Sequence, residues 1–138
     1  MATRNRYYPH LLDPDIDVWE QFLPAYGMLY TSFDYDIRVG KGRDPGPYVQ
    51  DKYRKVGIEL SQKRIDAVGH RPGRIDIIEI TVHADLKTLG QLIAYPDLYA
   101  STFNYRGPIQ PVLVAREISS DLTPAILKHQ IKTYLFPQ

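Results

Sequence analysis

Residues 65–95 read IDAVGHRPGRIDIIEITVHADLKTLGQLIAY, and the other elements of the chain can be placed around this segment. It contains two apolar runs, a turn with Gly and Pro between them, and then an amphipathic pattern that predicts a helix. Acidic residues lie inside the apolar runs, at Asp66 and Glu79. Burying a carboxylate among apolar side chains is costly unless it is paired, hydrogen-bonded or bound to a metal. We therefore expect the function of the protein, or a function that it has lost, to be located here.

The composition is typical of an ordinary globular domain. The chain has 138 residues, of which 43% are hydrophobic and 24% charged, and this length suits one domain with a sizeable core. The absence of cysteine excludes disulfides, thiolate zinc sites and a cysteine nucleophile. The net charge is only +1, so any surface that binds nucleic acid must be local.

The hydropathy pattern argues against a membrane protein. No apolar run approaches the roughly 20 residues of a membrane span. Residues 1–10 are basic but lack the apolar core of a signal peptide. We therefore expect synthesis in the cytoplasm and no membrane partner.

The N-terminal residues form a segment of their own. Residues 1–12 are expected to be an extended basic arm, and residues 13–138 a single domain. The arm is either a frayed terminus or a segment that becomes ordered on a partner, and the sequence leaves both open. Asp13 followed by Pro14 predicts a helix start, with Asp as the cap and Pro in the first turn. Pro24 is expected to end that helix.

The remaining elements follow from alternating strand and helix patterns. A hairpin turn is expected at residues 69–73, which read GHRPG. The residues after this turn carry Ile and Val on both faces, as in a central strand that is buried on both sides. The expected strands are Tyr30–Val39, Val56–Val68, Arg74–His83, Pro111–Ala115 and Ile131–Phe136, and a last helix begins at Asp121.

The helix after the hairpin has two distinct faces. Asp85 is expected to cap it, and Pro96 to kink or restart it. The face expected to pack on the sheet carries Leu86, Leu89 and Ile93. A second face carries Lys87, Gln91, Tyr95 and Tyr99, which follow one another at intervals of four residues.

The two strands of the hairpin can bring carboxylates together. Residues two apart on a strand point to the same face, so Glu79, Thr81 and His83 line one side. Asp66 is on the preceding strand and can lie across from them. Two carboxylates on adjacent strands are a suitable site for Mg²⁺, which takes one or two carboxylates and keeps its remaining waters.

Other chemistry is less well supported by the sequence. Lys41 and Arg43 lie in a Gly- and Pro-rich loop, residues 40–47, where they can contact phosphate or simply be solvated. The loop lacks the spacing of a phosphate-binding GxxxxGK[ST] loop. The chain also has no HExxH, GxSxG or GxGxxG motif, and its four histidines are scattered.

At these residues the chain resembles the PD-(D/E)XK nuclease superfamily, especially RecB-type nucleases and similar phage proteins. The matching segments are RIDAVG around Asp66, IIEIT around Glu79, and GQLIAY at residues 90–95. The resemblance implies an α/β fold with a restriction-endonuclease-like core (αβββαβ), in which a central mixed sheet is flanked by helices. It also implies that Asp66 and Glu79 bind Mg²⁺, and that Gln91 and Tyr95 contact nucleic acid.

One departure from the family pattern affects catalysis. The family has a Lys two residues after the second acid, and Thr81 occupies that position here. Such a Lys polarises the attacking water and stabilises developing charge, which an uncharged Thr cannot do. Lys87 is the nearest candidate for a displaced lysine. The carboxylates are then either a working metal site or a relic pair that is kept by hydrogen bonds.

Two classes of function remain open, and the sequence does not establish whether the chain is an enzyme. The first is a phage-type nuclease-like domain, catalytically impaired, that serves in virion assembly as a neck, head-completion or tail component. Its partners would be other virion proteins in an oligomeric assembly, and its location the virion or the host cytoplasm. The second is an active Mg²⁺-dependent nuclease that processes DNA ends.

Overall fold

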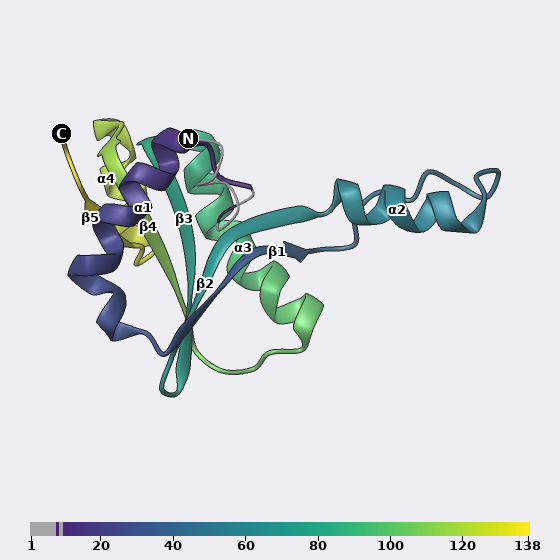
Figure 1. The fold of residues 1–138 in the computed structure, drawn as a ribbon, viewed down its shortest axis with the longest axis horizontal. Coiled ribbons are helices and arrows are strands. Elements are labelled where there is room, and N and C mark those ends of the chain that lie inside the picture. Colours follow the sequence, from purple (N-terminus) through teal and green to yellow (C-terminus); the bar gives the residue numbers. More distant parts are fainter. Residues whose placement is uncertain (1–7, 9) are drawn as a thin grey trace.

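The computed structural model describes residues 8 and 10–138, which build a five-stranded mixed sheet flanked by helices. The strands are β1 (Ser32–Val39), β2 (Lys63–Arg71), β3 (Arg74–Ala84), β4 (Ile109–Ile118) and β5 (Lys132–Leu135). They lie side by side in sequence order (Figure 1). β2 is antiparallel to both of its neighbours, β1 and β3, whereas β3, β4 and β5 are parallel. The predicted α/β fold with a central mixed sheet is confirmed.

Helices cover both faces of this sheet. The helices of the described chain are α1 (Asp13–Tyr26), α2 (Asp51–Ser61), α3 (Leu86–Phe103) and α4 (Thr123–Lys128), with short 3₁₀ turns η2 (Gly27–Leu29) and η3 (Ser120–Leu122). α1 packs on one face, and α3 and α4 pack on the other. Among the described helices, none is long and apolar enough to cross a membrane.

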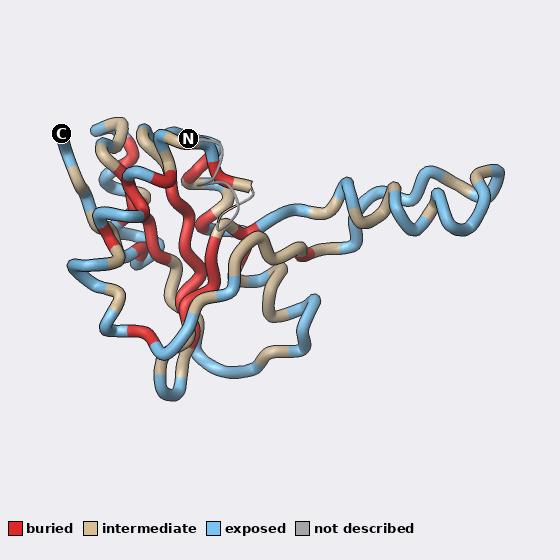
Figure 2. The backbone as a smooth tube through the Cα atoms, viewed as in Figure 1, coloured by how far each residue is buried: buried red, intermediate tan, exposed pale blue. Residues whose placement is uncertain are grey.

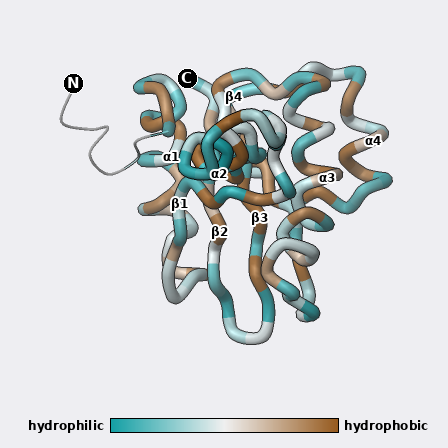
Figure 3. Tube along the Cα trace, turned by 90° about the vertical axis from the view of Figure 1, so that its right-hand side faces the viewer, coloured by the Kyte–Doolittle hydropathy of each residue, from teal (hydrophilic) through white to brown (hydrophobic). Residues whose placement is uncertain are grey.

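β3 is the centre of the core. Ile78 and Ile80 pack in the same cluster as Trp19 of α1. Ile75 and Ile77 point the other way and pack with Tyr95 of α3. Because side chains alternate along a strand, β3 has apolar side chains on both faces, as predicted. Figure 2 shows much of the trace of the central strands as buried, and Figure 3 shows hydrophobic stretches along β2 and β3.

The predicted strand Val56–Val68 is wrong in its first half. Residues 51–61 form helix α2, and β2 begins only at Lys63. The segment DKYRKVGIELS is rich in Lys, Arg and Glu, which favour a helix, and its Val and Ile misled the prediction. No residue of α2 is buried, and the structure describes all of them. With the loop before it, α2 projects far from the sheet (Figures 1 and 2).

Pro24 and Pro96 both lie inside continuous helices, contrary to the prediction. α1 does not end at Pro24 but continues to Tyr26, whose ring lies 4.4 Å from that of Tyr134. α3 does not restart at Pro96 but continues to Phe103. A proline removes one backbone hydrogen bond, and packing of the neighbouring residues against the sheet holds both helices together.

The face of α3 that packs on the sheet also differs from the prediction. Leu86 is 74% exposed and Ile93 is 40% exposed, although both were expected to point inward. Thr88, Leu92 and Tyr95 are buried instead, and Leu89 is only partly buried. A capping box between Asp85 and Thr88 fixes the first turn and draws Thr88 to the sheet. The polar face with Lys87 and Gln91 is thereby turned toward Asp66 of β2 and Glu79 of β3.

The described end of the N-terminal arm is packed on the domain. Leu11 is 4% exposed and belongs to the core cluster of α1. The ring of Tyr8 lies edge-on to that of Tyr35, at a centroid distance of 5.1 Å. Residues 1–7 and 9, which make up most of the predicted arm, lie outside the described residues.

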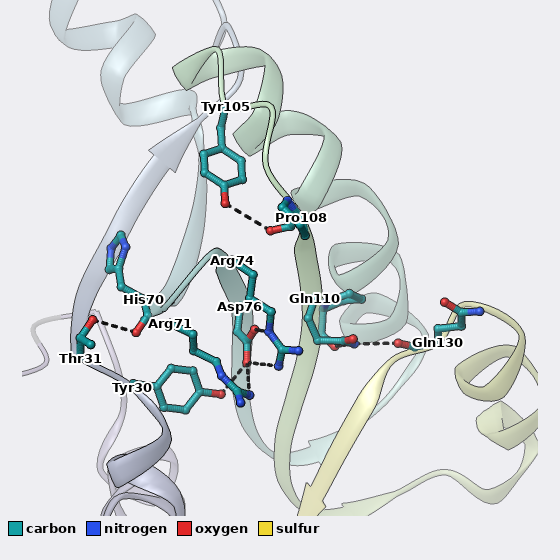
Figure 4. A network of polar contacts seen from close by, with 11 residues as sticks. Tyr30, Thr31, His70, Arg71, Arg74, Asp76, Tyr105, Pro108, Gln110 and Gln130 are labelled. Carbon is teal, nitrogen blue, oxygen red and sulfur yellow. Dashed lines mark hydrogen bonds and ion pairs between the residues drawn. The ribbon is translucent and has the colours of Figure 1, made fainter.

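A buried polar network joins the start of β1 to the β2–β3 hairpin (Figure 4). Asp76 is 1% exposed and accepts hydrogen bonds from Tyr30 Oη at 2.7 Å and Arg74 Nε at 3.0 Å. Arg71 Nη1 lies 3.9 Å from the same carboxylate. Burial and the bond to Asp76 raise the pKa of Tyr30. Asp76 is a third acid in the apolar runs, which the sequence analysis passed over, and two guanidinium groups balance its charge.

Candidate metal and nucleic-acid site

Asp66 and Glu79 lie at the point where β2 and β3 separate. The ladder between these strands runs from the pair Arg71–Arg74 to the pair Ala67–Ile78. Beyond it, Glu79 Oε2 accepts a hydrogen bond from the backbone N–H of Asp66 at 3.2 Å. Asp66 Oδ2 in turn accepts one from the N–H of Ile80 at 2.9 Å. Each carboxylate therefore bonds to the backbone of the opposite strand, in place of the missing ladder.

The free edge of β3 is bonded by a further carboxylate. Asp15, in the first turn of α1, accepts a hydrogen bond from the N–H of Val82 at 3.2 Å. β3 meanwhile stays paired with β4 as far as Ala84 and Ile118. The sheet thus opens between β2 and β3, and carboxylates accept hydrogen bonds from the backbone N–H groups of Asp66, Ile80 and Val82 there.

The carboxylates of Asp66 and Glu79 have little contact with solvent. Glu79 is 3% exposed, and the side chain of Asp66 is 20% exposed. Burial, followed by the charges of Asp15 and Asp36, raises the pKa of Asp66 to about 7. Burial and the charge of Asp66 raise the pKa of Glu79 well above its ordinary value. In the absence of a cation, the pair therefore retains a proton near neutral pH.

His10 is next to this pair, and the sequence gave no sign of it. Its side chain is 6% exposed, and Nε2 lies 3.5 Å from Asp66 Oδ1. Among the described residues, neither ring nitrogen has a hydrogen-bond partner. Burial lowers the pKa of His10 and favours the neutral imidazole. No motif surrounds His10 in the sequence, and only the packing of the residues before α1 brings it here.

Arg64 is a second residue whose role the sequence analysis missed. It forms a two-pronged pair with Asp36 of β1, with Nε 2.5 Å from Oδ1. Asp36 has φ of 56°, a left-handed conformation that is uncommon for a residue with a side chain. Arg64 is the first residue of the segment RIDAVG, so its nearness to Asp66 was the one available signal.

A cavity of about 220 Å³ lies between the separated strands and the start of α3. It brings together five residues that the sequence analysis singled out: Asp66, Glu79, Thr81, Lys87 and Gln91. Arg64, Ile80, His83, Asp85 and Thr88 complete its lining. The predicted convergence of the hairpin and the helix is therefore present in the structure.

The other predicted residues lie in adjoining hollows. Tyr95 is 6% exposed and, with Gln91, lines a larger hollow of about 570 Å³. Burial and then the charge of Glu79 raise the pKa of Tyr95, whereas a hydrogen bond with Gln91 lowers it. Lys41 and Arg43 line a third hollow, of about 330 Å³, and do not reach the carboxylates.

His83 is engaged with other groups. Its Nδ1 lies 2.9 Å from Glu117 Oε1, and its Nε2 lies 3.0 Å from Ser119 Oγ. Both ring nitrogens are therefore occupied, which leaves His83 as part of the cavity wall near the end of β3.

The donor set fits a hard cation that keeps much of its water. Within residues 8 and 10–138, no group of three or more His, Asp or Glu side chains is arranged to hold a metal ion. Two carboxylates nevertheless suffice for Mg²⁺, which binds proteins through one or two of them. In each carboxylate one oxygen accepts a backbone N–H, and the other, Asp66 Oδ1 or Glu79 Oε1, makes no hydrogen bond with the described residues.

The metal-free protein should become less stable as the pH rises from about 5 to 8. The folded state keeps a proton on Asp66 up to a pKa of about 7, whereas the unfolded chain releases it near pH 4. The folded state thus binds more protons in this window, so the free energy of unfolding falls, by on the order of 2 kcal/mol. Urea midpoints in EDTA at several pH values measure this.

Asp66→Asn is the matched control for the pH dependence. It keeps the shape of the side chain and should flatten the pH profile. His10 has a lowered pKa and acts in the opposite sense, whereas Glu79 has a raised pKa and acts in the same sense. The difference between the two proteins therefore measures Asp66 together with its effect on Glu79. A wild-type midpoint that is constant or rises over this window would contradict the prediction.

Comparison with known proteins relates the fold to nucleases. No protein-family model and no curated protein matches the sequence. A repair endonuclease from Pyrococcus abyssi aligns with a TM-score of 0.54 and 14% identity over 92% of this chain and 48% of its own. The EndoMS–dsDNA2 complex aligns with a TM-score of 0.52 and 13% identity over 92% of this chain and 46% of its own.

These two similarities establish the fold. The chain has a restriction-endonuclease-like nuclease fold, as the resemblance implied. It spans about half the length of both structures.

Proposed function

We propose that the protein is a nuclease-like domain that binds DNA and holds Mg²⁺ between Asp66 and Glu79, with weak phosphodiester hydrolysis. The observation that carries the proposal is the opening of the sheet at these two residues. Each carboxylate has one oxygen committed to the opposite backbone and one oxygen left for a ligand. The likeness of the fold to repair endonucleases, one of them in complex with double-stranded DNA, supports the same function.

The residues around the pair have distinct roles in this proposal. Asp66 Oδ1 and Glu79 Oε1 would hold Mg²⁺, whose chemistry there is to polarise the phosphate and lower the pKa of bound water. His10 Nε2, 3.5 Å from Asp66 Oδ1, is placed to hydrogen-bond a water at that oxygen. Gln91 and Lys87 line the same cavity and would orient the phosphate.

Hydrolysis should be weak because the cavity lacks a dedicated cation beside Glu79. Thr81 occupies that place and carries no charge. Arg64 lines the cavity, but its guanidinium is paired with Asp36. Lys87, at the start of α3, is the remaining candidate for a displaced lysine.

A second function, in assembly, is favoured by the projecting helix. α2 exposes Tyr53, Val56 and Leu60, which are 57%, 49% and 70% exposed, and Tyr48 of the preceding loop is fully exposed. Exposed apolar and aromatic side chains of this kind suit contact with another protein. A structural role in a phage virion, as a neck, head-completion or tail component, would use this surface and the N-terminal arm.

One experiment tests both functions. Purified protein is titrated with Mg²⁺ and Mn²⁺ by calorimetry, assayed on labelled DNA, and recorded by native mass spectrometry. We expect metal binding that Asp66→Asn and Glu79→Gln each abolish and His10→Ala weakens, together with slow cleavage. His129→Ala, which changes an exposed histidine away from the cavity, is the control.

Absence of both metal binding and DNA binding would contradict the nuclease-like function. If no divalent metal binds and no DNA is cleaved or bound, the nuclease-like proposal fails. A defined oligomer in the native spectrum, lost in Leu60→Asp, would then assign the function to assembly through α2.

A further inference from the structure

Three adjoining hollows form one groove across the molecule. The cavity of the carboxylates shares Arg64, Lys87 and Gln91 with the hollow of about 570 Å³. That hollow shares Lys63 and Leu98 with the hollow of about 330 Å³. The groove therefore leads from the metal site, between α3 and the start of β2, to the base of the α2 projection.

All of the charged residues that line the groove beyond the carboxylates are cations. Its charged residues are Lys41, Arg43, Lys63, Arg64 and Lys87, and among its described lining residues there is no Asp or Glu. Of these five cations, only Arg64 has an ion-pair partner within the described part of the chain. The chain as a whole carries a net charge of +1. The other four cations, which have no ion-pair partner among the described residues, are thus a local positive field that complements a polyanion.

Small residues of α3 leave enough space in the groove for a strand of nucleic acid. Gly90 and Ala94 line it, and a Cβ at Gly90 would meet no atom within 4 Å among the described residues. By the helical rise of about 1.5 Å per residue, Lys87 to Leu98 spans about 16 Å. The hollows are of the size of small-molecule sites, which suits one strand and excludes a duplex.

We propose that one strand of nucleic acid lies along this groove, running from the carboxylate pair to the α2 projection. Lys87, Lys63, Lys41 and Arg43 contact its successive phosphates. Tyr48 and Tyr53, which are exposed on the projection, are available to stack with unpaired bases. The assignment of the first phosphate to the carboxylates rests on the proposed function, whereas the groove itself does not.

The test uses the full chain in EDTA and a fluorescently labelled single-stranded DNA, with anisotropy measured at several salt concentrations. Lys41→Gln together with Arg43→Gln should weaken binding roughly tenfold at low salt and reduce the slope of log K against log salt by about 1.4. Lys128→Gln, on the exposed face of α4, is the charge control and should change neither quantity.

A second variant tests the path without changing charge. Gly90→Phe places a ring in the open space of the groove and should weaken binding by a similar factor, with no loss in Tm. Ile93→Phe adds a ring at a position of α3 that is 40% exposed and does not line the groove, so this control should bind as the wild type does.

Three outcomes decide the matter. Unchanged affinity and salt slope in both variants overturn the groove, and so does tighter binding of a blunt duplex than of the single strand. If the variants lose binding but the wild type cleaves no DNA with Mg²⁺ or Mn²⁺, the groove stands and the hydrolytic function fails. If the wild type cleaves DNA and both variants bind normally, the hydrolytic function stands and the groove fails.

Discussion

Thr81→Lys is expected to raise Mg²⁺-dependent DNA cleavage by about 10²–10³-fold, the usual contribution of one preorganised electrostatic group. Thr81 lies two residues after Glu79 on β3 and lines the same cavity. A Lys at this position would place an ammonium group beside the two carboxylates, where it can polarise the attacking water. Initial rates on a labelled DNA, with and without Mg²⁺, measure the gain.

Two further variants make this result specific. Thr81→Met has a side chain of comparable length without charge, so it should give no gain. Asp66→Ala in the Thr81→Lys background should abolish the gain, because the metal ligand is then missing. If Thr81→Lys is no faster than the wild type although Mg²⁺ binds, the missing charge does not limit the site. If the wild type cleaves well and Lys87→Ala abolishes cleavage, Lys87 is the displaced lysine and the protein is an active nuclease.

Asp76→Ala is expected to lower the free energy of unfolding by about 3 kcal/mol. Asp76 is 1% exposed and accepts hydrogen bonds from Tyr30 and Arg74. Its removal leaves the buried hydroxyl of Tyr30 without an acceptor and the positive charge of two arginines uncompensated. Urea unfolding followed by Trp19 fluorescence measures the loss.

An exposed pair provides the control for this effect. Asp34 and His70 lie 2.7 Å apart on β1 and β2, and the side chain of Asp34 is 56% exposed. Asp34→Ala should therefore change the stability by less than about 1 kcal/mol. Equal effects of the two substitutions would show that the Asp76 network does not hold the hairpin to β1.

The sequence predicted the hairpin, the central strand and the carboxylate pair, because each leaves a local pattern. Two apolar runs around a Pro-Gly turn indicate antiparallel strands, and Asp66 and Glu79 are conspicuous among apolar neighbours. The capped helix that follows places Lys87 and Gln91 at a fixed distance along the chain. The convergence of the hairpin and α3 around the carboxylates could therefore be predicted from local patterns alone.

What the sequence did not predict depends on contacts between distant segments. His10 comes to Asp66 only because Leu11 is buried in the core, and Arg64 is held by Asp36 from another strand. The groove lined by cations is built from residues of the loop after β1, the start of β2 and one face of α3. The face of α3 was itself misjudged, since the capping box with Asp85 outweighed apolar periodicity.

The projection between β1 and β2 gives the molecule a modular build. Val39 and Lys63 are paired across the two strands, so the insertion begins and ends at neighbouring positions, as a hairpin loop does. No residue from 40 to 62 is buried, and all of them are described. The folding core is therefore insulated from changes in the insertion. The insertion can therefore change in length or charge without altering the packing that holds the domain together. Such changes would alter which partners its surface can bind.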